Sequence, residues 1–264
     1  MKVVFVGDVV GSVGRKALKN ILPYIKKTQN PDFLIVNGEN AAGGKGITPE
    51  IAKEIYDLGA HGITLGNHSW DKREIFEYID EDKRMIRPAN FPLGTPGKGY
   101  TILKNGSKEL AIVNVQGRTF LPPLDCPFAK MDQIVHELPN RIKHIFVDFH
   151  AEATSEKIAM GWHLDGKVSA VVGTHTHVQT HDEQILPQGT AYVTDVGMVG
   201  SREGVLGMER EAVLRKFMTQ LPVRFVSDSG KWQFHGISLE LDDATGKAKK
   251  IKLLRHFEDE VRFE

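Results

Sequence analysis

The stretch FLIVNGEN (residues 33–40) begins as an apolar run and ends in two amides and a carboxylate, Asn37, Asn40 and Glu39. Phe, Ile and Val favour strands, so the run predicts a buried strand that stops on polar side chains. The same ending recurs in VVFVGD (3–8), GITLGNH (62–68), HIFVDFH (144–150) and SAVVGTHTH (169–177). Five strand-like runs therefore end on side chains that can bind metal ions.

The first hundred residues alternate between strand-like and helix-like patterns. Residues 14–27 carry apolar side chains at helical spacing between the first two strand-like runs. Thr48, followed by Pro49, has the features of a helix N-cap, and Asp71 with Glu74 three residues on predicts a second cap. Apolar strands without strict alternation, separated by helices, indicate an α/β sheet that is covered on both faces.

Two hairpins are expected outside this alternating region. One joins residues 100–103 to 110–115, and the other joins residues 234–241 to 250–257 across the turn DDATGK. The remainder of residues 88–123 is rich in proline and glycine, which indicates loops. Because no repeat and no linker interrupts the chain, we expect one domain over residues 1–264.

Composition limits the classes of function. The 34 basic and 34 acidic side chains balance, so a long nucleic acid is not an expected partner. Cys126 is the only cysteine, which excludes an internal disulfide and a thiolate-rich metal site and suits a reducing compartment. The N-terminal apolar run is too short for a signal peptide or a membrane span. These features predict a cytoplasmic protein, without a membrane partner, that acts on a small ligand.

The ends of the five strand-like runs predict one site. In an open α/β sheet, ligands bind beyond the carboxyl ends of the strands. The side chains expected at this edge are Asp8, Glu39, Asn40, Asn67, His68, His150, His175 and His177.

The number and type of these side chains predict two metal ions. Mixed oxygen and imidazole ligands suit Fe, Mn or Zn. One ion that keeps an open catalytic position cannot use seven ligands, whereas two divalent ions that share a carboxylate can. Since only Asp8 and Glu39 are anionic, such a site keeps an excess of positive charge, which a phosphate ester would neutralise. The site therefore predicts hydrolysis of phosphoesters.

Several alternatives remain open at this stage. Asp148 and His150 fall on the same face of one strand, so strand periodicity cannot tell which of them is the ligand, and His150 could instead orient Glu152. Asn40 also fits a simple turn. The glycines of GDVVGSVG (7–14) do not match the spacing of a dinucleotide-binding loop.

The motifs together resemble a known family. GD (7–8), GNH (66–68), the lone His150 after a strand and GTHTH (173–177) resemble the calcineurin-like metallophosphoesterase superfamily in order and spacing. With NGEN, GNHSWDK, RPANFP, QGRTFLPPLD, DFHAEATSEK and VGTHTHVQT, nearly the whole chain looks like the bacterial YmdB-type branch. The chain departs from the superfamily because Val9 and Val10 follow Asp8 in place of Asp-x-His, and Glu39 stands in place of the usual bridging Asp.

The resemblance carries specific expectations. It implies a sandwich of two mixed sheets flanked by helices, with Glu39 bridging two ions. One ion would be bound by Asp8, Glu39, Asn40 and His177, and the other by Glu39, Asn67, His150 and His175. His68 would be the general acid.

The expected reaction follows from the same resemblance. It implies a phosphodiesterase acting on 2′,3′-cyclic nucleotides by attack of a metal-bridging hydroxide. Three alternatives remain: a phosphomonoesterase, a hydrolase of RNA ends, and a non-catalytic regulator that keeps the metal site. A homo-oligomer is also compatible with the sequence.

Overall fold

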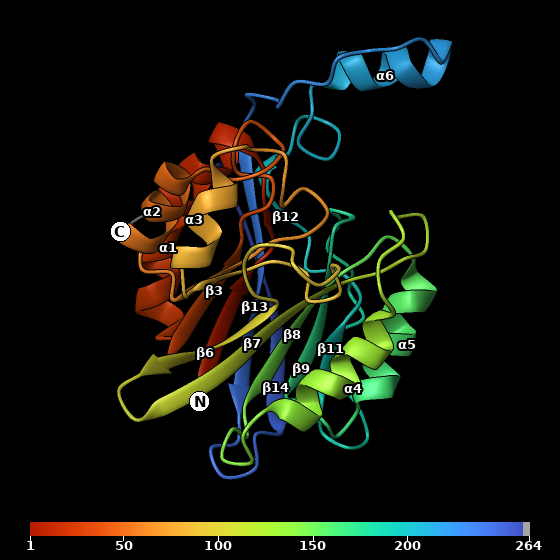
Figure 1. The fold of residues 1–264 in the computed structure, drawn as a ribbon. Coiled ribbons are helices and arrows are strands. Elements are labelled where there is room, and N and C mark those ends of the chain that lie inside the picture. Colours follow the sequence, from red (N-terminus) through yellow and green to blue (C-terminus); the bar gives the residue numbers. More distant parts are fainter. Residues whose placement is uncertain (261–264) are drawn as a thin grey trace.

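The computed structural model describes residues 1–260, which form two β-sheets packed face to face (Figure 1). The first sheet has the order β2 (Asp8–Val9), β12 (Met198–Ser201), β13 (Trp232–Leu241), β1 (Lys2–Val6), β3 (Phe33–Asn37), β4 (Gly62–Thr64) and β5 (Met85–Ile86), with β14 (Ala248–Phe257) paired to β13. The second sheet has the order β10 (Gln184–Ile185), β11 (Ala191–Val193), β9 (Ala170–Thr174), β8 (Ile145–His150), β7 (Lys108–Gln116) and β6 (Tyr100–Asn105).

Both sheets are mixed, as predicted. In the first sheet β1, β3, β4 and β5 run parallel to one another, while β13 is antiparallel to β1, β12 and β14. In the second sheet β7, β8, β9 and β11 are parallel, and β6 and β10 are antiparallel additions at its edges. The hairpins β6–β7 and β13–β14 confirm the two hairpins expected from the sequence.

Helices cover the outer faces of the sandwich. They are α1 (Gly11–Gln29), α2 (Pro49–Asp57) and α3 (Ile75–Glu81) on the first sheet, α4 (Pro127–Glu137) and α5 (Thr154–Leu164) on the second, and α6 (Arg210–Thr219), which projects from the body (Figure 1). The side chain of Thr48 accepts a hydrogen bond from the Ile51 amide, so the predicted cap of α2 is confirmed. No helix within residues 1–260 is both long and apolar enough to cross a membrane.

Each sheet is apolar on both faces because it packs against the other sheet and against helices. Alternation along β1 turns Val4 and Val6 toward α1, whereas Phe5 enters the core between the sheets. There the ring of Phe5 lies 5.0 Å from the ring of Phe146 on β8, measured between centroids. This double burial explains why the strand sequences lack strict polar alternation.

One predicted cap was wrong. Helix α3 begins at Ile75, and its N-cap residue, Glu74, makes no side-chain hydrogen bond to the helix. The carboxylate of Asp71 instead lies 2.8 Å from the ring nitrogen Nδ1 of His68. An acid three residues before another acid is typical of a capping box, but here the nearby imidazole binds the first acid instead.

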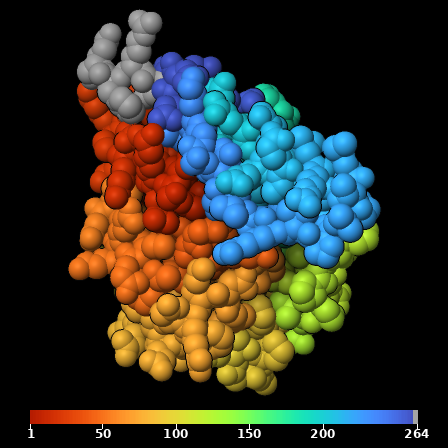
Figure 2. Space-filling model, turned by 90° about the horizontal axis from the view of Figure 1, so that it is seen from above, coloured from red at the N-terminus to blue at the C-terminus, as the bar shows by residue number. Residues whose placement is uncertain are grey.

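The segment between β12 and β13 contains α6 and borders the ligand-bearing loops. Figure 2 shows this segment in blue beside the orange residues that follow β3. Only Val213 of α6 is buried, and Phe217 and Met218 are largely exposed. The base of the segment, rather than α6 itself, reaches the site described next.

Candidate metal centre

The carboxyl ends of β1, β3, β4, β8 and β9 meet at one end of the sandwich. The backbone amide of His175 donates to Oδ2 of Asp8 over 3.2 Å, which joins the first strand to the ninth. The backbone amide of His68 donates to Oε2 of Glu39 over 3.0 Å, which joins the loops after β4 and β3. Residues far apart in the sequence, and in different sheets, therefore share one site.

A first group of side chains surrounds Nε2 of His150. This nitrogen lies 2.8 Å from Oδ1 of Asn67, 3.0 Å from Oε1 of Glu39 and 3.1 Å from Nδ1 of His175. Glu39, His150 and His175 each offer a ligand atom, and these atoms lie within 4.8 Å of one another. Such a set of oxygen and imidazole donors suits one transition-metal ion.

A second group of side chains shares Oε1 of Glu39 with the first. Nδ2 of Asn40 is 3.1 Å from Oε1 of Glu39 and 3.2 Å from Nε2 of His177, which is itself 3.9 Å from Oδ1 of Asp8. As a ligand Asn40 would present its amide oxygen, which requires the amide to rotate so that oxygen and nitrogen exchange places. All seven predicted ligands are thus brought together, and Glu39 belongs to both groups.

The buried carboxylate of Asp8 supports the fit of a cation. Asp8 is fully buried, and its Oδ1 has no hydrogen-bond partner among residues 1–260. An unpaired buried carboxylate oxygen is costly, and a bound cation removes that cost. Burial also raises the pKa of Asp8.

Opposite charges shift the pKa values of the other donors. Burial opposes the charge of Glu39, but His150 and His68 together outweigh it and lower the pKa of Glu39 to about 2. In the same way burial opposes protonation of His150, yet Glu39 raises its pKa to about 9. Burial and the nearby His150 lower the pKa of His175 to about 3, so that its imidazole is neutral at pH 7 and free to bind a metal.

Close packing holds Glu39 and His150 against the chain. A Cβ atom placed on Gly66 would lie 2.3 Å from Oε2 of Glu39 and 2.5 Å from the His150 ring. No side chain fits there, so the glycine of the GNH motif lets the two ligands approach the backbone. His175 and His177 adopt φ angles of 101° and 65°, a region that residues with side chains rarely occupy and that is often found at functional sites.

His68 adjoins both groups but is separate from them. Its backbone binds Glu39, while its side chain pairs with Asp71 and borders the hollow above the ligands. Pairing of Nδ1 with a carboxylate fixes the orientation of the ring. This arrangement suits a residue that donates a proton.

The hollow above the ligands has a volume of 260 Å³, and part of its lining was missed in the sequence. Lys45 comes from the loop after β3, Glu152 from the loop after β8, and Leu206 and Met208 from the segment before α6. Glu152 lies 3.0 Å from Nε2 of His175. Glu152 falls within the motif DFHAEATSEK, but Lys45, Leu206 and Met208 lie outside the quoted motifs on loops without periodicity, so no signal in the sequence predicts these three at the site.

Asp148 and His150, between which strand periodicity could not choose, make different contacts. Asp148 is saturated by the side chains of Asn37, Thr64 and Thr174, away from the ligand groups. His150 does not orient Glu152, which contacts His175 instead. His150 is therefore the one of the pair that lies among the predicted ligands.

Comparison with known proteins agrees with this architecture. Residues 4–254 match the family model described as YmdB-like protein. The chain is 55% identical, over the full length of both proteins, to a protein of Bacillus subtilis (strain 168) named 2′,3′-cyclic-nucleotide 2′-phosphodiesterase.

Solved structures extend the comparison. A crystal structure of a Mycoplasma pneumoniae protein described as a novel phosphatase superposes with a TM-score of 0.92 at 33% identity, covering 97% of this chain and 93% of the other. The calcineurin-like phosphoesterase YfkN from Bacillus subtilis has a TM-score of 0.52 at 11% identity, covering 97% and 90%, and shows likeness of fold alone. The chain belongs to the YmdB-like protein family and has the fold of calcineurin-like phosphoesterases.

Proposed function

We propose that the protein is a metal-dependent phosphodiesterase that hydrolyses small phosphodiesters, with 2′,3′-cyclic nucleotides as its substrate class. The observation that carries this proposal is the convergence of seven oxygen and imidazole donors from five strand ends, with Glu39 shared between two groups. The name of the Bacillus subtilis relative supports the choice of substrate.

The donor set fits two divalent ions, Fe or Mn, with Zn as the alternative. Asp8, Glu39, Asn40 and His177 would hold one ion, and Glu39, Asn67, His150 and His175 the other. When bound, two such ions supply positive charge to the phosphate and make a bound water acidic enough to act as a nucleophile near neutral pH. The ligand side chains are contributed by both sheets, which supports a single metallophosphoesterase domain over residues 1–264.

His68 supplies the proton that the reaction requires. Attack of water on the phosphorus of a cyclic phosphate breaks one bond to a ribose oxygen, and that oxygen must gain a proton as it leaves. The imidazole of His68 borders the hollow, and Asp71 holds its Nδ1 at 2.8 Å, which leaves Nε2 for the leaving oxygen. General acids of this kind contribute about 10²- to 10⁴-fold to the rate.

The rest of the hollow offers complementary contacts to a nucleotide. Lys45 supplies a positive charge beside the ligand groups, where it can pair with a phosphate oxygen. Leu206 and Met208 form an apolar wall on the opposite loop, suited to the face of a base. A volume of 260 Å³ is small, which favours a mononucleotide over a polymer.

Metal analysis combined with hydrolysis of 2′,3′-cyclic nucleotides tests this proposal on wild type and His68→Ala. We expect two ions per chain in both proteins and turnover about a hundredfold or more lower in the variant. His136, an exposed histidine at the end of α4, provides the matched control, since His136→Ala should retain wild-type turnover. Equal turnover of the His68 and His136 variants would remove His68 from the mechanism.

A rival activity is hydrolysis of phosphomonoesters or RNA ends at the same site, and the description of the Mycoplasma pneumoniae structure as a phosphatase favours testing it. Rates on bis(4-nitrophenyl) phosphate, 4-nitrophenyl phosphate and cyclic nucleotides separate the two. Cleavage of monoesters alone would overturn the diesterase proposal. A metal-loaded protein that hydrolyses no phosphoester would instead be a non-catalytic regulator.

A further inference from the structure

A carboxylate that is not among the predicted ligands lies directly beneath them. Asp148 precedes His150 by two residues on β8 and is fully buried. Strand alternation turns both side chains toward the first sheet, on the same side as Phe146 in the inter-sheet core. Asp148 is thus buried like a core residue and lies next to the candidate metal centre.

Three donors saturate this carboxylate. The hydroxyl of Thr174 on β9 donates to Oδ1 over 2.7 Å, and the hydroxyl of Thr64 on β4 and the amide of Asn37 on β3 donate to Oδ2 over 2.5 and 3.1 Å. All three donors are fully buried and stand one to three residues before a predicted ligand. The carboxyl group of Asp148 therefore accepts three hydrogen bonds from side chains of three different strands.

Thr174 connects Asp148 to the metal centre. Its hydroxyl has a single hydrogen, which is directed at Oδ1 of Asp148. Nδ1 of His150 lies 2.9 Å from the same hydroxyl oxygen, which is therefore left to accept a hydrogen bond. His150 then donates from Nδ1 to this oxygen, so Nε2, which faces Asn67, Glu39 and His175, is the ring nitrogen left to bind a cation.

We infer that Asp148 and Thr174 form a relay that positions His150 for metal binding. Asp148 fixes the direction of the Thr174 hydroxyl, and that hydroxyl holds the imidazole in the one tautomer and ring orientation that presents Nε2 to the ion. Both are positioning residues, since neither contacts the ligand atoms of the other side chains. This inference rests on the proposed function, because it assumes that the cluster binds metal.

Partners of this kind commonly raise metal affinity by about 10- to 100-fold, because they orient the ligand ring and increase its basicity. The alternative is that Asp148 only joins the two sheets. Thr64 separates the two explanations, because it donates to the same carboxylate from an equally buried position but is not a partner of His150.

The test measures Mn²⁺ affinity by calorimetry on the full-length chain after removal of its metal, together with thermal unfolding in chelator. Thr174→Val should bind Mn²⁺ about 10- to 100-fold more weakly than wild type. Thr174→Ser, which keeps the hydroxyl, should restore the affinity. Thr64→Val should lose a similar amount of thermal stability while its affinity stays close to that of wild type.

The outcomes are separable. Wild-type affinity in Thr174→Val, equal losses of affinity in the Thr174→Val and Thr64→Val variants, or no rescue by serine would each overturn the relay. A wild-type protein that binds no Mn²⁺ would instead contradict the proposed function, since the relay would have no ion to serve.

Discussion

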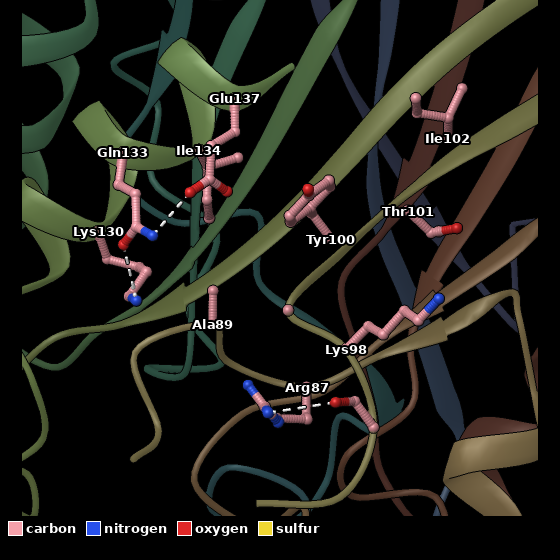
Figure 3. Close-up of a pocket in the computed structure, with 12 residues that line it drawn as sticks. Arg87, Ala89, Lys98, Tyr100, Thr101, Ile102, Lys130, Gln133, Ile134 and Glu137 are labelled. Atoms are coloured by element: carbon pink, nitrogen blue, oxygen red, sulfur yellow. Dashed lines mark hydrogen bonds between the residues drawn. The ribbon is translucent and has the colours of Figure 1, made fainter. Parts of the chain in front are cut away.

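The hollow over the ligand cluster has a volume of 260 Å³, whereas the pocket between β6 and α4 has a volume of 460 Å³ (Figure 3). In the larger pocket the polar groups bind one another. Lys130 donates to Gln133, which donates to Glu137, and the buried Arg87 donates to four backbone carbonyls. These four side chains, Arg87, Lys130, Gln133 and Glu137, therefore already have partners.

The smaller hollow lies over groups that are not satisfied. Oδ1 of Asp8 has no hydrogen-bond partner within residues 1–260, and Oδ1 of Asn67, Nδ1 of His175 and Nδ2 of Asn40 crowd around the contact between Nε2 of His150 and the Glu39 carboxylate. Burial and neighbouring charges also shift the pKa values of these residues strongly. The two hollows therefore differ in their unpaired and closely spaced polar groups rather than in volume alone, and it is the smaller one that has the features of the proposed metal site.

The largest effect is expected from Glu39→Gln, which removes the carboxylate common to both ligand groups. We expect the rate of phosphodiester hydrolysis to fall by about a thousandfold or more, equivalent to about 4 kcal/mol of transition-state stabilisation. Glu137→Gln makes the same change in the larger pocket and should leave the rate within about twofold of wild type, since surface substitutions rarely matter. Steady-state kinetics on one cyclic nucleotide measures both variants.

Two results would contradict the contrast drawn between the two pockets. A Glu39→Gln enzyme with near-normal turnover would show that the shared carboxylate is dispensable. A large loss of turnover in Glu137→Gln would place function in the larger pocket.

Arg87→Met tests whether the larger pocket has only a structural role. Arg87 is 8% exposed, and the substitution leaves the carbonyls of Pro88, Thr95, Pro96 and Gly97 without their donor. We expect the free energy of unfolding to fall by about 3 kcal/mol, while kcat of the folded protein is unchanged. Chemical denaturation gives the stability and kinetics the turnover. A drop in kcat with unchanged stability would assign this pocket a functional role.

His235 is a buried side chain that lacks hydrogen-bond partners in the described part of the chain but lies outside both pockets, so we expect it to affect stability and not catalysis. Neither of its ring nitrogens has a hydrogen-bond partner among residues 1–260, and it lines neither pocket. Burial, with a smaller effect of Arg255, lowers its pKa to about 4. Because the unfolded chain binds the proton more readily, the stabilisation is complete above about pH 6.5 and is lost as the pH falls toward 4.

The effect of His235 on the free energy of unfolding is expected to be smaller than the effects of the Glu39 and Arg87 substitutions. Between pH 7.5 and pH 5 wild type should lose about 2 kcal/mol of stability through this residue, and His235→Phe should lack that part of the loss. Thermal unfolding across this pH range provides the measurement. An identical pH dependence in the two proteins would mean that His235 is protonated equally in the folded and unfolded chain, and a loss of turnover in the variant would make it functional.

The sequence predicted the part of the site that lies at the ends of strands. Each of the seven ligand candidates follows an apolar run, and the parallel strands bring such positions to a common edge, so their meeting could be expected. Periodicity could not separate Asp148 from His150, because both lie on one face and only the donors of neighbouring strands distinguish them. The role of Asp71 was misjudged for a related reason, since a local spacing cannot reveal that an imidazole competes for the carboxylate.

The walls of the hollow could not be predicted. Lys45, Leu206 and Met208 lie on loops whose positions are set by packing between distant segments, and neither loop has a repeating pattern. The two-sheet architecture followed from resemblance to a family. Apolar strands alone are equally compatible with one large sheet covered by helices on both faces.

The central claim is that the side chains of residues 8–177 hold a pair of cations that share the Glu39 carboxylate. Anomalous diffraction from crystals of the Mn²⁺-loaded protein tests it most directly. We expect two peaks about 3.5 to 4 Å apart, with Glu39 in contact with both. A single peak, or two peaks that do not share Glu39, would contradict it.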